Sequence, residues 1–220
     1  MGLSFKTKEH PSCPDDDTMN LYSFLINNHK YINLTFSILS KKRINSADIV
    51  KRIKVSPEIE DVLIDSKLDE YCLLMDIFYN TSKDCLSVRR GMLLELVLRD
   101  IKANNGTTGH QVIPESLVFY NGTELTKKDI DVVFKYLELE LIECKATLEN
   151  YLHVDPLPSD KKEKLEFMKL VKDKAESDSI ECYLFLATYS VEVFQPKEIL
   201  KNNKLDVFSI LTRKDIIDRL

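Results

Sequence analysis

Three ionisable residues near the middle of the chain have the types and spacing of a small acid-and-lysine site. Asp131 lies in an apolar run of strand length, residues 130–134, and Glu143 lies in a second one, residues 139–144. β-Branched and aromatic residues are frequent in both runs, so we expect two strands. A reversal midway between the two acids places them opposite each other on one face of a hairpin, and the pleat puts Lys145 on the same face.

The chemistry of such a cluster points to a metal ion. Two carboxylates held close together repel each other, and burial makes both charges costly. Mg²⁺ relieves this, because it prefers oxygen ligands and is commonly held by one or two carboxylates, water and a substrate phosphate. Lys145 would hold or deprotonate an attacking water, or counter the charge that grows on a phosphate. The competing interpretation is a solvated hairpin face on which acids and lysine merely balance one another.

Asp131 followed by Glu143-Cys144-Lys145 resembles the D…(D/E)-x-K signature of the PD-(D/E)xK, or restriction-endonuclease-like, nuclease superfamily. The resemblance covers roughly residues 86–215. No proline precedes Asp131, which departs from the motif that names the family. The resemblance implies a nuclease that depends on Mg²⁺ or Mn²⁺ and acts on DNA more often than on RNA. It also implies that Asp131 and Glu143 bind the metal, that the Cys144 carbonyl adds a ligand, and that Lys145 positions water.

The first helix of the family pattern often supplies one further glutamate. Glu95 matches it, because residues 89–98 fit that helix. On a helical wheel Glu95 shares a polar face with Arg99, so a surface ion pair at i+4 is an equally good interpretation.

Several lysines near the predicted site have two interpretations. Lys127 and Lys128 stand just before the first hairpin strand, where they would contact a phosphate or belong to a solvated loop. Lysines are also frequent in the amphipathic run 161–175, and we interpret them as a solvated helix face rather than as a nucleic-acid contact. The positions are 161, 162, 164, 169, 172 and 174.

These residues need a scaffold that brings two strands and a helix together. We expect an α/β (α+β) fold with a mixed central sheet flanked by helices and a restriction-endonuclease-like core. The nuclease-like domain would span residues 86–220. The residues between the hairpin strands, 136–138, include no Gly, Asn or Pro, so no tight turn is favoured there. The core elements are expected at 86–104 (helix), 112–120 (strand), 161–175 (helix), 180–188 (strand) and 205–211 (strand).

Residues 1–85 are expected to form a mostly helical interaction region. The first 17 residues form a loose arm or an edge strand, and residues 32–38 alternate in polarity, so a strand is possible there. Ser46–Ile53 and Ser56–Ser66 have the outline of a helix-turn-helix. The second of these segments is acidic and would face phosphates, so a protein-docking layer is the better interpretation.

The composition is that of an ordinary globular protein of 220 residues with a net charge of −5. This acidic balance gives no support to nucleic-acid binding by itself, so metal and local lysines would have to offset it. The five cysteines form no C-x-x-C pair, and the sequence has neither a signal peptide nor a membrane-length apolar run, which favours a reduced cytoplasm. Glycine-rich phosphate loops, G-x-S-x-G and H-E-x-x-H are absent from the sequence.

The sequence therefore predicts a cytoplasmic, metal-dependent nuclease that hydrolyses nucleic-acid phosphodiester bonds. By analogy with the family it would serve bacterial antiviral defence or DNA repair, as a homodimer or beside a helicase or another defence partner, without a membrane. One alternative is a non-catalytic protein-interaction module that keeps a nuclease-like fold. Another is a phosphoesterase for a small nucleotide, which would need a closed pocket.

Overall fold

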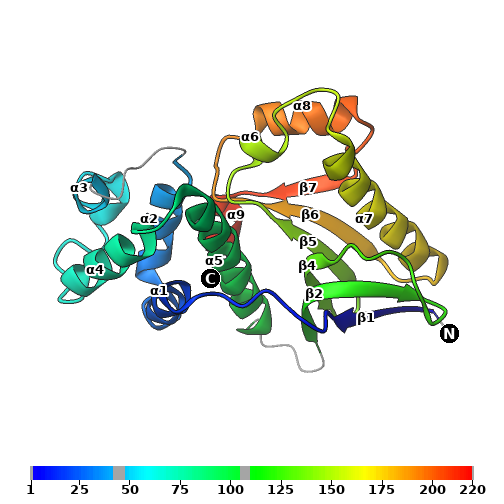
Figure 1. The fold of residues 1–220 in the computed structure, drawn as a ribbon, viewed down its shortest axis with the longest axis horizontal. Helices are drawn as coiled ribbons and strands as arrows, with labels where there is room; N and C mark the ends of the chain where they lie inside the picture. The colour runs from blue at the N-terminus through cyan, green and yellow to red at the C-terminus, as the bar shows by residue number, and fades with distance from the viewer. Residues whose placement is uncertain (1, 42–47, 105–109, 220) are drawn as a thin grey trace.

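A seven-stranded mixed sheet forms the centre of the protein (Figure 1). The structure is a computed structural model that describes residues 2–41, 48–104 and 110–219. The strands are β1 (Leu3–Thr7), β2 (Gln111–Tyr120), β3 (Thr123–Glu124), β4 (Ile130–Lys135), β5 (Leu139–Cys144), β6 (Cys182–Ala187) and β7 (Phe208–Leu211). Their order is β1-β2-β4-β5-β6-β7, with β3 paired to β2. The pairs from β1 to β5 are antiparallel, whereas β5, β6 and β7 run parallel.

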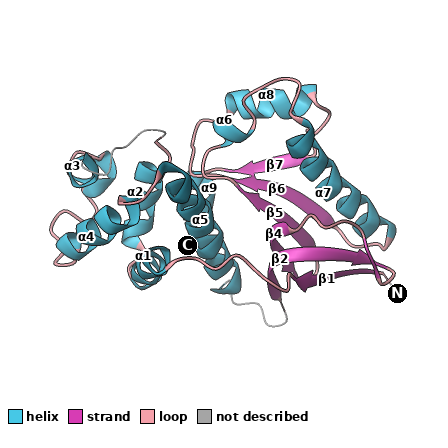
Figure 2. Cartoon of the chain, in the orientation of Figure 1, coloured by secondary structure: helices cyan, strands magenta, loops and turns pink. Residues whose placement is uncertain are grey.

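Helices cover both faces of the sheet (Figure 2). The long helix α5 packs against β2, β4 and β5, and α7 packs against β6. The helices α1 to α4 lie beyond α5, away from the sheet, and form a helical layer. The helices are α1 (Asp16–Asn27), α2 (Lys30–Leu39), α3 (Ile49–Lys54), the 3-10 turn η2 (Pro57–Ile59), α4 (Leu68–Tyr79), α5 (Lys83–Asn104), α6 (Leu148–Tyr151), α7 (Ser159–Ser177), α8 (Phe194–Asn202) and α9 (Arg213–Ile217).

Each face of the sheet has its own core. Val132 and Ile142 pack with apolar residues of α1 to α5, whereas Val133 and Leu141 pack under α7 on the other face. Side chains alternate between the two faces of a strand, so a strand covered on both sides is buried at every position. This is the state of β5, in which even the glutamates are buried.

The expected fold class is confirmed, since a mixed sheet is flanked by helices and the N-terminal region is mostly helical. The expected edge strand near the N-terminus is β1, which pairs with β2. The division into residues 1–85 and 86–220 stays a prediction. The helical layer and the sheet share one continuous core through α5. None of the described helices is both long and apolar enough to cross a membrane.

Two expectations for the N-terminal region are wrong. Residues 32–38 form part of the helix α2 rather than a strand. Nearly every residue of α2 is buried, including Thr35 and Ser37, so the alternation of apolar and polar types carries no information about exposure. Residues 56–66 form only the short turn η2 followed by further turns, so no second helix of a helix-turn-helix exists there. The first two residues of the other segment, Ser46–Ile53, lie outside the described residues.

Candidate active site

The β4–β5 hairpin has the register that the sequence predicts. Val132 pairs with Ile142 and Val133 with Leu141, so one further step along the ladder sets position 131 across from position 143. The chain reverses through residues 136–138, where the Tyr136 N–H donates to the Glu138 carbonyl at 3.0 Å. The reversal forms without any Gly, Asn or Pro, because long apolar strands buried on both faces fix the pairing.

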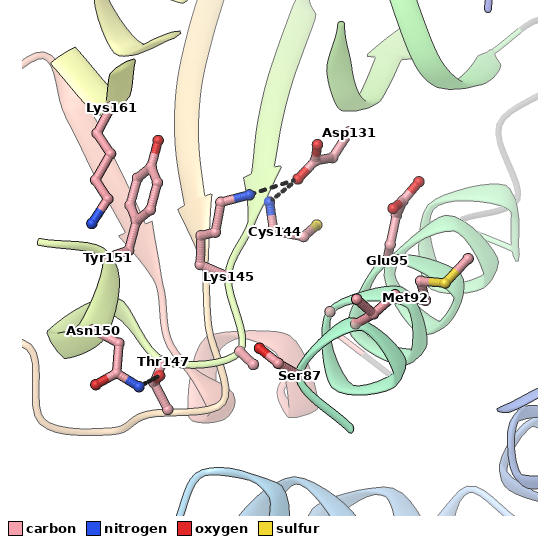
Figure 3. A pocket seen from close by; sticks show the side chains of 13 residues that line it. Ser87, Met92, Glu95, Asp131, Cys144, Lys145, Thr147, Asn150, Tyr151 and Lys161 are labelled. Atoms are coloured by element: carbon pink, nitrogen blue, oxygen red, sulfur yellow. Dashed lines mark hydrogen bonds and ion pairs between the residues drawn. The ribbon is translucent and has the colours of Figure 1, made fainter. Parts of the chain in front are cut away.

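Lys145 brings the two acids together at the end of β5. Its Nζ lies 2.7 Å from Glu143 Oε1 and 3.5 Å from Asp131 Oδ2. The Cys144 backbone N–H donates to the same Asp131 oxygen at 2.7 Å (Figure 3). The Lys145 backbone N–H donates to Ala187 of β6 at 2.9 Å, which keeps the residue aligned with the sheet. The predicted convergence of Asp131, Glu143 and Lys145 is therefore present.

A second lysine completes the surroundings of Glu143. Lys164 projects from α7, with its Nζ 3.0 Å from Glu143 Oε2. The side chain of Lys164 is only 14% exposed, so the interpretation of this lysine as part of a solvated face is wrong. Lys164 immediately precedes the buried Leu165, and this position at the border of the apolar stripe is the signal that could have indicated it.

Burial and neighbouring charges together shift the pKa values of Glu143 and Lys145. Burial and the nearby Asp131 carboxylate hold the pKa of Glu143 above its ordinary value, although Lys145 and Lys164 oppose the shift. For Lys145, burial favours the neutral amine, but the two carboxylates outweigh it and hold the pKa above its ordinary value. Lys145 is therefore a cation at neutral pH, suited to attracting negative charge rather than to removing a proton.

Glu95 of α5 forms the ion pair that the sequence suggested, and its role as a metal ligand stays a prediction. Its side chain lines the same cavity as Asp131 and also forms an ion pair with Arg99. Burial raises the pKa of Glu95 from 4.5 to about 7, and the Asp131 and Glu115 carboxylates add to the rise, while Arg99 opposes it. The Asp131 and Glu115 carboxylates are thus close enough to disfavour the charged form of Glu95.

The site opens into a cavity of about 420 Å³ between α5 and the segment that runs from β5 through α6 to the start of α7. Asp131, Cys144 and Lys145 form its floor (Figure 3). Glu143 does not line the cavity, because its carboxylate is turned toward Lys164 and the α7 face of the sheet.

The described residues suit a small hard cation only in part. Among them, no three or more His, Cys, Asp or Glu side chains are placed to hold a metal ion by themselves. Mg²⁺ commonly needs only one or two carboxylates, with water and phosphate in the remaining positions. Glu95 and Asp131, whose mutual repulsion a cation would relieve, fit such a site. Glu143 fits it only after one of its two lysines moves away.

The predicted nucleic-acid contacts lie outside this cavity. Lys127 is exposed in the loop before β4, and Lys128 Nζ lies 2.9 Å from Glu163 Oε2 of α7. A phosphate contact by either lysine stays a prediction.

Comparison with known proteins adds no family assignment. No protein-family model matches this chain, and no curated protein matches it either. The likeness to PD-(D/E)xK nucleases therefore depends on the signature residues and the order of the elements alone.

Proposed function

We propose that this protein is a divalent-metal-dependent nuclease that hydrolyses phosphodiester bonds in DNA. The observation that carries the proposal is the convergence of Asp131 and Glu143 on Lys145, beside an open cavity that Glu95 also lines. Acidic oxygens and one lysine beside an open cavity are groups that can hold a metal ion and stabilise the charge that develops in hydrolysis of a phosphate ester.

The residues that line the cavity would have different roles in the reaction. Asp131, Glu95 and the Cys144 carbonyl would hold Mg²⁺ or Mn²⁺, and Glu143 would join them if a lysine is displaced. The bound metal would supply Lewis-acid activation of the phosphate and of a water molecule. In hydrolysis a water oxygen would bond to phosphorus while the bond from phosphorus to the sugar oxygen breaks, and the proton that the water loses would pass through solvent to the leaving sugar oxygen. Negative charge would grow on the phosphate oxygens during this step. Lys145, as a cation in the cavity floor, would donate to the water and stabilise this charge.

We further propose that the protein acts in the cytoplasm, in DNA repair or bacterial defence, together with a second copy or a partner such as a helicase. The acidic net charge of −5 supports a partner that delivers the DNA, because long-range attraction to phosphates is weak. The helical layer, which takes no part in the cavity, would offer the docking surface.

The test is cleavage of plasmid, linear and single-stranded DNA with Mg²⁺ or Mn²⁺, with and without EDTA. We expect EDTA to stop cleavage, and Lys145→Ala and Glu143→Ala each to reduce it by about 100-fold or more. Lys135→Ala is the matched control, because Lys135 is exposed at the far end of the same hairpin. Equal cleavage by the Lys145→Ala, Glu143→Ala and Lys135→Ala variants would show that the site is assigned wrongly.

A second candidate is an interaction module in which the site is idle. It is favoured by the ion pairs that already engage the ionisable groups of the site, including Glu95 with Arg99 and Glu143 with two lysines. Calorimetric titration with Mn²⁺ separates the two candidates. An idle site takes up no metal even when DNA is present, whereas a nuclease site takes up metal and loses this binding in Asp131→Asn.

A further inference from the structure

The two walls of the cavity differ in chemistry. The α5 wall consists of Ser87, Val88, Gly91 and Met92, together with the acidic Glu95. The opposite wall comes from α6 and the first turn of α7 and is polar, with Tyr151 and Lys161 among its residues (Figure 3).

A cationic cluster runs along the polar wall. The Tyr151 ring lies between two lysines, with Lys145 Nζ 5.3 Å and Lys161 Nζ 5.5 Å from its centroid (Figure 3). The ring holds both ammonium groups by cation–π attraction. Lys145 is also paired with two carboxylates, whereas Lys161 forms no ion pair with any residue that the structure describes. Lys161 is thus a half-buried cation that is available for an anion.

The α5 wall offers no such cation. All three arginines of α5 are engaged within the protein: Arg89 with two aspartates, Arg90 with the Leu39 carbonyl, and Arg99 with Glu95. Apart from the acidic Glu95, this wall presents small or apolar residues.

Gly91 keeps the α5 wall open. A Cβ atom built on Gly91 would meet no atom within 4 Å, so the space in front of this residue is empty. Next to it, Val88 is 59% exposed although it is apolar. An apolar surface that water reaches, opposite a cation, is suited to a ligand with one apolar flat part and one anionic part.

We infer that the cavity takes a single strand of DNA rather than a duplex. The inference rests on the proposed function, since it names the form of DNA that reaches the same site. A duplex carries phosphates on both strands, so a site that grips it needs cations on two sides, and this cavity has them on one. Sites for single strands combine cations along one backbone with apolar or aromatic surfaces for the unpaired bases. The cavity of about 420 Å³ lies in the size range of a small-ligand pocket, enough for one nucleotide at a time.

In this arrangement Lys161 and Lys145 contact successive parts of one sugar–phosphate backbone. The base of the bound nucleotide packs against Val88 and Met92, in the space in front of Gly91. Tyr151 acts as a spacer that fixes the separation of the two ammonium groups.

The test measures binding separately from cleavage. Fluorescence anisotropy in EDTA, with a labelled 12-nucleotide strand and the corresponding duplex, gives the dissociation constants across a series of salt concentrations. We expect the single strand to bind at least about tenfold more tightly than the duplex. Lys161→Ala should weaken single-strand binding about fivefold and reduce the salt slope by about 0.7, while Lys161→Arg should retain both.

Two further variants test whether a loss of single-strand binding reflects misfolding or the removal of any positive charge. Lys162→Ala is the matched control, because Lys162 is the next residue, is exposed and pairs with Glu166 at 3.8 Å. It should leave binding unchanged. Gly91→Leu should weaken single-strand binding by filling the space in front of the α5 wall, while its melting temperature stays equal or rises, because leucine favours a helix more than glycine does.

The outcomes separate this inference from the proposed function. Equal binding of duplex and single strand, or equal effects of Lys161→Ala and Lys162→Ala, would overturn the inference, even if DNA is cleaved with Mn²⁺. Lys161-dependent binding without any cleavage would support the single-strand site and contradict the nuclease. Absence of both binding and cleavage would overturn both.

Discussion

Glu95 is held in surroundings that weaken the folded state. Burial and two neighbouring carboxylates raise its pKa to about 7, whereas the ordinary value is 4.5. The folded protein therefore binds this proton more tightly than the unfolded chain does. The resulting penalty is absent below about pH 4.5, grows as the pH rises, and is complete above about pH 7.

Glu95→Gln should consequently stabilise the protein in a pH-dependent way. We expect the free energy of unfolding to rise by on the order of 2 kcal/mol at pH 8, where glutamine replaces an ionised carboxylate. At pH 4 it should stay unchanged, because the protonated Glu95 is neutral, as glutamine is. Urea unfolding in EDTA at both pH values measures it. Glu124→Gln, at an exposed position in β3, should have no effect at either pH. An equal gain at pH 4 and pH 8 would contradict the argument.

At the level of single residues the sequence predicted the hairpin residues of the site and Glu95 of α5, but not the residues that α6 and α7 contribute. Asp131, Glu143 and Lys145 could be placed because pairing and pleat relate neighbouring strands by simple counting. Lys164 and Tyr151 could not be placed in the same way. Their contacts depend on how a later helix and its connection lie over the sheet, and helical spacing alone does not determine that.

Among the secondary-structure elements, α5 belongs both to the site and to the helical layer. Arg89 of α5 is 9% exposed and donates to Asp15 Oδ2 at 2.6 Å and to Asp17 Oδ2 at 2.5 Å, at the start of α1. It also donates to the Phe78 carbonyl at the end of α4, at 2.8 Å. One guanidinium group therefore joins three helices.

Arg89→Ala should destabilise the protein by about 2–4 kcal/mol, because it leaves a buried carbonyl without its donor and removes two charge-assisted hydrogen bonds. Lysine should recover only part of the loss, since it lacks the planar fork that reaches several acceptors at once. Urea unfolding at pH 7 provides the measurement. Arg52→Ala, on the exposed side of α3, should cost far less. A similar cost for both alanine variants would show that Arg89 has no special structural role.

Elements with one buried stripe were predictable, and the element buried all round was not. The expected helices at residues 86–104 and 161–175 lie within a few residues of the observed α5 and α7. The prediction for α2 was wrong because other helices surround this helix, so its buried residues show no helical periodicity. The helix that the helix-turn-helix outline suggested for residues 56–66 is also wrong, because only the short turn η2 forms there.

Across the whole molecule, a contact between distant segments connects the helical layer to the C-terminal helix. Glu58 of η2 accepts a hydrogen bond from Arg213 Nη1 of α9 at 3.1 Å. Burial raises the pKa of Glu58, but hydrogen bonds from Ser56 and Ser37, together with Arg213, outweigh it and lower the pKa from 4.5 to about 2. A lowered folded-state pKa contributes stability that is present above about pH 4.5 and is lost as the pH falls toward 2.

Glu58→Gln should therefore lower the free energy of unfolding by on the order of 2 kcal/mol at pH 7, and this difference should vanish near pH 2. Thermal or urea unfolding between pH 7 and pH 2 measures the difference. Glu60→Gln, two residues away and exposed, should unfold like the unsubstituted protein over the same range. A difference between Glu58→Gln and the unsubstituted protein that does not change with pH would contradict the assignment of the stability to this charge.

The strand order and the shared core could not be predicted from the sequence. The parallel neighbours β5, β6 and β7 follow from how α7 and α8 cross the sheet, and the pairing of β1 with β2 joins segments more than 100 positions apart in the chain. Such arrangements depend on the packing of complete elements, so no local pattern specifies them.

The continuous core around α5 has a mechanical consequence. Leu94 and Leu98 of α5 belong to the core that the helical layer and the sheet share, while Glu95 and Gly91 of the same helix line the cavity. A helix behaves as a stiff rod, so a small rotation imposed on its packed side also displaces the side that lines the cavity. A protein that binds the helical layer would thereby widen or narrow the entrance of the cavity without contacting the cavity itself.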